Sequence, residues 1–543
     1  MEINKIHIID ILERLPFLET VKDCGEEKGL WTLMLKFATE DQQTLVFNMY
    51  VNLYQSPMKL CGNSPVRFSN PQLIEYPHIM HAGSLCMQTR NCVTWEDRIL
   101  EDINALHEWI LKFYVNKELD EHYEDLVVED VSIKGRKKLF YYSQLDTLPP
   151  IGEYGMVAYT KLTGSKCDNK TDTYLVQALV YGEKRISSGE WSDCYSKRKY
   201  EIGLFAMLNG SPSVYDKFAI ENYADLQGLC SEKQLEYLYG QLYRSGKDYL
   251  PIFWGYQTPS GKLRWLITYP NRNMPFIKGE KHKVESEVKW IPKLTNVRME
   301  QAATEGCSYD QFFGRGGFHD SFADKKVLLL GVGAVGSIVA TTLIRCGIKD
   351  ITLSDYDDKH SGNICRSEYL FDTGKTKKID ELKQILQSIS PFVKVTEVED
   401  LHIVLKQTSS LKLAEVTKIL DMFDIVFDCS IDSEMMWAID KMATKAQVIN
   451  LSISNEAKEL VCAFSPNVSE FVSRVYTDVI KEGTGDMYNP EGCWSPTFKA
   501  SYNDVQVMVQ YALRNIVRML SGESAKANFM IREIDESLKL IRW

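Results

Sequence analysis

The sequence lacks closely spaced cysteine pairs. Its 13 cysteines are scattered, and no CxxC motif occurs in the chain. Structural zinc ribbons need such pairs, so no structural zinc is expected. The N-terminus shows no signal-peptide pattern, and an irregular set of cysteines in such a chain indicates reduced thiols in the cytoplasm.

The sequence also lacks long apolar runs and an excess of basic residues. The stretch 327–344 alone approaches the length of a membrane span, and its three glycines fit a nucleotide-binding loop better, so no membrane segment is expected. Lys and Arg total 63 against 74 Asp and Glu, a net charge of −11. This balance argues against direct nucleic-acid binding, which normally requires a basic face.

The chain is long enough for several domains. Its 543 residues are 44% hydrophobic and 25% charged, an ordinary globular composition. Residues 1–128 combine helical ends with strand-like runs, which predicts an α+β domain. Residues 129–300 contain Tyr-rich β-prone runs without a catalytic motif, which predicts an α+β connecting domain. Residues 301–543 alternate strands and helices, the pattern of an α/β domain with a doubly wound parallel sheet.

A glycine-rich turn opens the α/β part. KVLLLGVGAVGS places Gly331, Gly333 and Gly336 after a buried strand and at the start of a helix, where backbone N–H groups can meet phosphates. Asp355 ends the next strand, nineteen residues after Gly336, where a carboxylate can hold ribose hydroxyls. By themselves these residues suit an NAD-dependent dehydrogenase at least as well as an ATP enzyme.

The residues downstream favour a triphosphate. They are the N-x-x-R pair Asn363 and Arg366, and the lysines Lys375, Lys377 and Lys378. Hydride transfer does not need so many cations, whereas loss of pyrophosphate builds negative charge that they would stabilise. Each cation could instead belong to a solvated surface.

Two more residues complete the ordered set. Asp428 in VFDCSID ends a later strand and could hold Mg²⁺, although it could also cap a helix. Arg315 lies upstream in QFFGRGGF.

Residues from about 308 to 520 resemble the ThiF/MoeB/ubiquitin-activating superfamily, with Arg315, GVGAVG, SDYD, N-x-x-R, GKTKK and DCS in the family's order. The resemblance implies that ATP and Mg²⁺ are used to adenylate the C-terminal carboxylate of a protein. It implies that Arg315 reaches a partner subunit's phosphates in a homodimer. It also implies that Asp355 binds ribose, that Asp428 binds Mg²⁺, and that the phosphates are held by Asn363, Arg366 and Lys377, with the choice among the lysines open.

Cys493 is the candidate thiol of this part. It lies in NPEGCWSPTF, a Pro/Gly-punctuated loop before a long helix, and the loop resembles that of the activating cysteine in bacterial fused enzymes. A thiolate there could attack an acyl adenylate to give a thioester. An incidental thiol is the alternative.

Cys86 is the candidate thiol of the N-terminal part. Residues 65–114 resemble the core of ubiquitin-conjugating (UBC) enzymes, with Gly83 and Cys86 as G-x-x-C and Trp95 nine residues later. That family usually has His-Pro-Asn before its cysteine, whereas this chain has Tyr76-Pro77-His78. His78 could donate a ring N–H in place of the asparagine, or serve the loop structurally.

The layout resembles the fused activating–conjugating enzymes of bacterial CBASS anti-phage operons. This resemblance implies two protein partners: a substrate with a flexible C-terminus, a cGAS-like nucleotidyltransferase, and a target that supplies an amine. Three alternatives stay open: a fusion serving a bacterial ubiquitin-like modifier, a non-catalytic nucleotide-binding scaffold, and a dehydrogenase.

Overall fold

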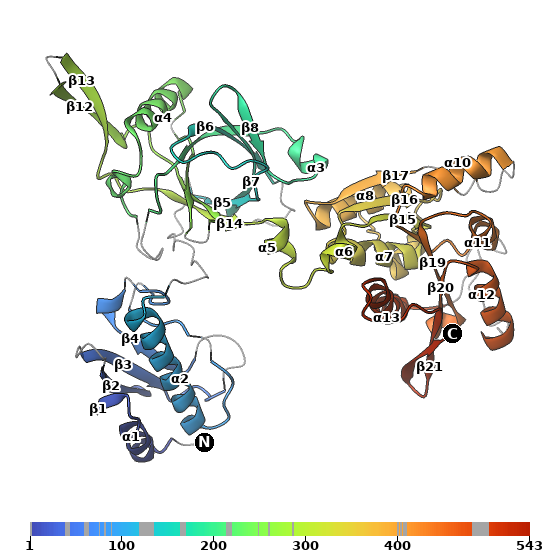
Figure 1. The fold of residues 1–543 in the computed structure, drawn as a ribbon, viewed down its shortest axis with the longest axis horizontal. Coiled ribbons are helices and arrows are strands. Elements are labelled where there is room, and N and C mark those ends of the chain that lie inside the picture. The colour runs from blue at the N-terminus through green and yellow to red at the C-terminus, as the bar shows by residue number, and fades with distance from the viewer. Residues whose placement is uncertain are drawn as a thin grey trace. The chain divides into compact units, whose positions relative to one another are not determined.

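The computed structural model describes most of the chain in two compact units (Figure 1). The first unit comprises Met1–Ser188 and Tyr200–Gly306, and the second comprises Gly189–Lys199 and Cys307–Trp543. The described residues are 3–38, 44–58, 64–74, 76–80, 83–87, 89–118, 135–162, 170–212, 220–247, 249–258, 261–284, 287–398, 401, 404, 410–480 and 499–543.

The N-terminal part of the first unit is an antiparallel four-stranded sheet with two helices (Figure 1). Alternate residues of the strands, such as Leu33 and Leu35, are buried on one face. Helix α2 contributes Ile99, Ile103 and Leu106 to the same core, at the spacing of one helical face. The elements are α1 (Lys5–Glu13), β1 (Leu18–Glu27), β2 (Leu30–Ala38), β3 (Thr44–Asn52), β4 (Val66–Ser69), a 3₁₀ turn (Pro71–Leu73), α2 (Trp95–Trp109) and a π-helical extension (Ile110–Val115).

The rest of the first unit is a closed β-barrel. The strand order is β5-β14-β11-β10-β9-β6-β7-β8, and a further pairing of β5 with β7 closes the ring. Aromatic side chains fill the interior: Phe140 stacks on Tyr174 with ring centroids 4.8 Å apart and meets Phe253 edge-on. The strands are β5 (Lys137–Tyr142), β6 (Tyr154–Lys161), β7 (Thr171–Tyr181), β8 (Arg185–Ser188), β9 (Glu201–Met207), β10 (Ile252–Gln257), β11 (Leu263–Thr268) and β14 (Gln301–Gly306). The other elements are a 3₁₀ turn (Tyr223–Leu226), α4 (Glu232–Ser245) and the hairpin β12 (Ile277–Val284) and β13 (Glu287–Leu294).

The second unit is built on one sheet of order β17-β16-β15-β18-β19-β20-β21-β22. The strands from β17 to β19 are parallel and the remainder antiparallel. Since β15 comes first in the parallel part and lies at its centre, the chain winds outward in both directions, which confirms the predicted doubly wound α/β fold. The strands are β15 (Lys326–Leu330), β16 (Asp350–Ser354), β17 (Lys394–Glu397), β18 (Ile425–Asp428), β19 (Gln447–Ser454), β20 (Glu459–Phe464), β21 (Phe529–Ile534) and β22 (Ser537–Arg542).

Helices cover both faces of this sheet. Val327 and Leu329 of β15 belong to one core with α7, α8 and α13, whereas Leu328 and Leu330 belong to another with α10, α11 and α12. The helices of the unit are α3 (Asp193–Ser196), α5 (Tyr309–Phe313), α6 (Asp320–Ala323), α7 (Ala334–Arg345), α8 (Lys378–Ile389), α10 (Ser410–Leu420), α11 (Ser433–Asp440), α12 (Val468–Arg474) with a π-helical extension (Val475–Ile480), and α13 (Tyr502–Leu520); 3₁₀ turns lie at Ser361–Arg366 and Asn455–Ala457.

The stretch 327–344 folds as β15, the glycine turn and α7. Among the described helices, none combines the length and apolar character needed to cross a bilayer.

Candidate functional site

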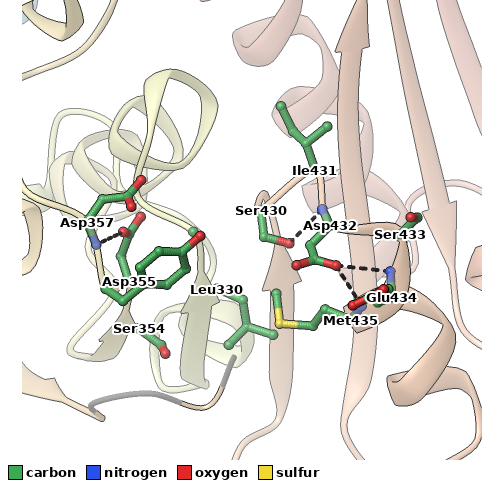
Figure 2. Close-up of a pocket in the computed structure, with 12 residues that line it drawn as sticks. Leu330, Ser354, Asp355, Asp357, Ser430, Ile431, Asp432, Ser433, Glu434 and Met435 are labelled. Atoms are coloured by element: carbon green, nitrogen blue, oxygen red, sulfur yellow. Dashed lines mark hydrogen bonds between the residues drawn. The ribbon is translucent and has the colours of Figure 1, made fainter. Parts of the chain in front are cut away.

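A pocket of about 380 Å³ lies at the carboxyl ends of β15, β16 and β18 (Figure 2). Strands β16 and β18 flank β15 on opposite sides, so the pocket sits where the winding direction of the sheet reverses. Open α/β sheets bind ligands at this position. The lining residues are Leu330, Gly331, Ser354, Asp355, Tyr356, Asp357, Ser430, Ile431, Asp432, Ser433, Glu434 and Met435.

The three glycines have three distinct environments. Gly331 has φ +77°, and a Cβ on it would lie 2.6 Å from the Cα of Ser430. Gly333, before α7, has open space where a Cβ would be, so a ligand can approach the backbone there. A Cβ on Gly336 would collide with the carbonyl of Gly331, so glycine permits the close approach of helix to strand. This arrangement fits a phosphate-binding turn.

Asp355 connects the glycine turn after β15 to the chain after β16. Its Oδ2 accepts a 2.8 Å hydrogen bond from the N–H of Val332, and its Oδ1 accepts one of 2.8 Å from the N–H of Asp357. Figure 2 shows the side chain beside Asp357 on the wall opposite 430–435. The carboxylate therefore lies at the pocket. That it contacts a ribose remains a prediction.

Asp428 is buried, whereas Asp432 is partly exposed. The side chain of Asp428 is buried, with the residue 1% exposed, and it accepts hydrogen bonds from Ser430 Oγ (2.6 Å) and Asn450 Nδ2 (3.0 Å). Burial raises the pKa of Asp428 against these hydrogen bonds, which lower it. Asp428 is not among the lining residues, whereas Asp432 and Glu434 are (Figure 2).

Asp432 was not singled out in the sequence. Its Oδ1 accepts hydrogen bonds from the N–H groups of Glu434 and Met435, so it caps α11 (Figure 2). A capping aspartate and a ligand-binding one have the same sequence pattern. The available signal was its position four residues after Asp428 in VFDCSID.

The described residues alone do not form a complete metal cage. No group of three or more His, Cys, Asp or Glu side chains in the described part of the chain could hold a metal ion. A Mg²⁺ ion here would therefore complete its shell with phosphate oxygens and water, as Mg²⁺ commonly does. The carboxylates of the pocket fit an ion of that kind.

The predicted phosphate-binding residues do not line the pocket. Asn363 and Arg366 lie on the 3₁₀ turn Ser361–Arg366, where Asn363 Oδ1 accepts a 2.8 Å hydrogen bond from the N–H of His360. Arg366, at the end of the turn, is partly exposed. Lys377 is exposed and directly precedes α8.

Two neighbouring lysines are paired with acids. Lys378 Nζ lies 2.6 Å from Asp357 Oδ2, and Asp357 lines the pocket. Lys375 Nζ lies 3.2 Å from Asp358 Oδ2. Of these two, Lys378 is the one tied to the pocket wall, and the role of Lys377 remains a prediction.

Arg315 lies in an exposed turn between α5 and α6. The N–H groups of Gly316 and Gly317 both donate to the carbonyl of Phe313, which folds the turn back onto α5. Within the described residues, no hydrogen bond or ion pair involves its guanidinium. An exposed arginine of this kind is available to a ligand.

Cys86 and His78 lie side by side in the first unit. The N–H of Cys86 donates a 2.7 Å hydrogen bond to the carbonyl of His78, and the Cys86 side chain is exposed. The His78 ring packs against Phe113, with centroids 5.2 Å apart. A Cβ on Gly83 would lie 2.8 Å from the backbone of Pro71, which explains the glycine of G-x-x-C.

Cys493 lies outside the described residues. Helix α13 follows it, and the Tyr502 hydroxyl donates a 2.5 Å hydrogen bond to Glu368, two residues after Arg366. Burial, followed by Glu368, raises the pKa of Tyr502 to about 12. The start of α13 is thus fixed beside the N-x-x-R turn.

The C-terminal part is similar to known proteins. Residues 310–501 match the model of the ThiF family, which confirms the resemblance indicated by the motifs. The "ATP-dependent ubiquitin transferase-like protein Cap2" of Enterobacter hormaechei subsp. hoffmannii (strain UCI 50) is 26% identical over 238 residues, 42% of this chain and 38% of that protein. "Ubiquitin-like modifier-activating enzyme 5" of Culex quinquefasciatus is 29% identical over 138 residues, 25% of this chain and 34% of that protein.

These matches span between about a third and two fifths of the length of the curated relatives. Among solved structures, E. coli MccB with AMPCPP and MccA matches with a TM-score of 0.30 and 16% identity, over 41% of this chain and 64% of that one. PaaA matches with a TM-score of 0.29 and 17% identity, over 43% of this chain and 67% of that one.

Proposed function

We propose that this chain, in which residues 310–501 match the ThiF family, adenylates the C-terminal carboxylate of a protein. It then transfers the resulting acyl group through two thioesters to an amine. The observation that carries the proposal is the glycine turn opening onto a carboxylate-lined pocket at the reversal point of the sheet. Gly333 leaves room for a phosphate, and the carboxylates suit a Mg²⁺ that is shared with ATP.

Charge distinguishes adenylation from hydride transfer. Asn363, Arg366 and Lys377 lie between the pocket strands β16 and β18 in sequence and would stabilise the departing pyrophosphate. In this step a carboxylate oxygen bonds to the α-phosphorus of ATP, and the bond from that phosphorus to the bridging oxygen of pyrophosphate breaks. Both aspartates would serve Mg²⁺: Asp432, which lines the pocket, would contact the ion, and Asp428, the residue predicted for this role, would act through Ser430 beside it.

The adenylate then acylates a thiolate. Cys493 would attack the acyl carbon and release AMP, and the acyl group would pass to Cys86 with return of a thiolate at Cys493. The exposure of Cys86 and the backbone bond that fixes it beside His78 support this role in a UBC-like domain. An amine of the target finally replaces the Cys86 sulfur to form an amide.

The proposed partners follow from the resemblance to CBASS fusions. The substrate would be a cGAS-like nucleotidyltransferase with a flexible C-terminus, modified in the bacterial cytoplasm by a homodimer in which Arg315 reaches the partner's phosphates. The name of the Cap2 relative supports a ubiquitin-transferase type of reaction. A fusion acting on a ubiquitin-like modifier would use the same residues, so candidate C-termini should be compared directly.

The test is substrate-dependent ATP–pyrophosphate exchange. Arg366→Ala should lower the exchange rate by about 100-fold or more, the usual effect of removing a group that stabilises transition-state charge. Arg474→Ala, at an exposed arginine paired with Glu470 on α12, is the matched control and should leave exchange unchanged. Full exchange by Arg366→Ala would refute the assignment of the phosphate site, and nicotinamide binding in place of ATP would favour a dehydrogenase.

A further inference from the structure

The segment 189–199 joins strands β8 and β9 of the barrel, yet it folds with the second unit. Its N–H at Ser192 donates a 2.8 Å hydrogen bond to the carbonyl of Pro391, and the Tyr195 hydroxyl donates one of 2.9 Å to the carbonyl of Gln387. Gln387 lies in the last turn of α8, and Pro391 lies just after the helix. A loop of the connecting region is thus built into the adenylating unit.

The same segment contacts the helix that precedes Arg315. Trp191 is buried and stacks on Phe392, with centroids 5.5 Å apart. Phe392 in turn meets Tyr309 and Phe312 of α5, at 5.6 Å and 5.7 Å. Glu190 Oε1 accepts a 2.7 Å hydrogen bond from the N–H of Tyr309, the first residue of α5.

Helix α5 needs such outside support. It has five residues, and an isolated helix of that length is unstable in water. Arg315 follows it between Gly314 and Gly316, in a turn whose hydrogen bonds return to Phe313. The position of the arginine therefore depends on α5, and α5 packs on Phe392 and so on the residues of 189–199 that contact it.

We infer that Trp191 and Glu190 are positioning residues, through which the connecting region holds Arg315 in place for adenylation. The inference rests on the proposed function, because it assigns a consequence to the placement of Arg315. Neither residue needs to touch a substrate. Misplacing a catalytic group by about 1 Å can cost on the order of 100-fold in rate.

The test is a double-mutant cycle on ATP–pyrophosphate exchange by the full chain. Trp191→Ala should lower kcat by roughly tenfold to 100-fold with a smaller change in KM for ATP, and Trp191→Phe should restore most of it. Adding Trp191→Ala to Arg315→Ala should cause no further loss, because both changes remove the same contribution. Lys197→Ala, at an exposed lysine paired with Asp193 on the same segment, should leave exchange unchanged.

The outcomes separate the two hypotheses. If Arg315→Ala keeps full exchange, the role proposed for Arg315 fails. If Arg315→Ala is impaired while folded Trp191→Ala is fully active, or if the two losses multiply in the double mutant, the inference fails alone. Should Trp191→Ala not fold, the exposed Glu190→Ala replaces it: a smaller loss that is absent in the Arg315→Ala background and rescued by Glu190→Gln supports the inference, and any other pattern refutes it.

Discussion

Asp428 and Asp432 leave the same strand end and have different physical tasks. Asp428 is enclosed by Ser430 and Asn450, so its charge can act on a ligand only through its neighbours. Asp432 faces the pocket while capping α11. Burial disfavours the charged form of a carboxylate, which explains why the pKa of Asp428 is raised.

Asp432→Asn separates the charge of this residue from its capping role. Asparagine caps helices about as well as aspartate, so the free energy of unfolding should change by less than about 0.5 kcal/mol. Loss of the charge should weaken Mg²⁺ binding, and exchange should then require a higher Mg²⁺ concentration. Exchange assays across a Mg²⁺ titration, together with thermal unfolding, check both statements; an unchanged Mg²⁺ dependence would exclude Asp432 as a metal ligand.

At the scale of elements, one buried ion pair fixes the segment between the N-x-x-R turn and α8. Lys359 and Glu381 pair with each other and are both nearly inaccessible. Glu381 also accepts hydrogen bonds from the N–H of Leu370 (2.7 Å) and the hydroxyl of Thr376 (2.8 Å). The pair therefore shapes the chain that connects Arg366 to Lys377.

The Lys359–Glu381 pair predicts a pH dependence of stability. Burial raises the pKa of Glu381, but Lys359 and the hydrogen bonds outweigh it and hold the pKa below the ordinary value of 4.5. A carboxyl whose pKa is lowered on folding contributes stability that is fully present above the ordinary pKa of 4.5. That stability is lost as the pH falls from there through the folded-state pKa. Glu381→Gln should cost about 3–5 kcal/mol at pH 7, since it leaves Lys359 buried and unpaired. The free energies of unfolding of the two proteins should approach each other as the pH falls below about 4.5. A difference that stays constant with pH would show that the ion pair is not the source of the effect.

A second buried pair links α2 to the chain that follows Cys86. Arg98 and Asp102 are fully buried, and Arg98 Nη1 donates a 2.9 Å hydrogen bond to the carbonyl of Arg90, while Asp102 accepts one of 2.8 Å from Thr89. Arg98→Met alone should destabilise the domain by about 3–5 kcal/mol, and Arg98→Met with Asp102→Leu should recover most of this. Denaturant unfolding measures the energies. A double mutant no more stable than Arg98→Met would contradict the account.

Local patterns predict most elements of the second unit and miss long-range ones. The buried runs and glycine turn of β15 and α7 appear in the sequence because period and spacing encode them. Closure of the barrel cannot be recognised in the sequence in this way, because the pairing of β5 with β7 depends on the register between distant strands. The docking of 189–199 was missed for the same reason: Trp191 finds its partner, Phe392, about two hundred residues away.

At the scale of the whole chain, fusion of two thiol-bearing parts has a kinetic consequence. The chain passes between the two units at 188–189, at 199–200 and at 306–307. Tethering replaces a bimolecular encounter of two enzymes with an effective concentration that can reach the millimolar range. Transfer from Cys493 to Cys86 should therefore not depend on enzyme concentration.

Single cysteine variants test the order of the relay. Cys493→Ala should still release pyrophosphate, because adenylation precedes attack by a thiolate, yet it should leave both cysteines unloaded. Cys86→Ala should form a thioester at Cys493 and then stop, with amide product reduced by at least about 100-fold, as expected when the nucleophile of a covalent mechanism is lost. Cys24→Ala, at another exposed cysteine of the first unit, is the matched control and should behave as the unmodified chain.

Non-reducing gels with and without thiol distinguish the species, since reductant removes a thioester and spares an amide. Normal amide yield from Cys86→Ala would show that the N-terminal domain does not carry the acyl group, whereas loading of Cys86 in Cys493→Ala would show that Cys493 is not the first acceptor.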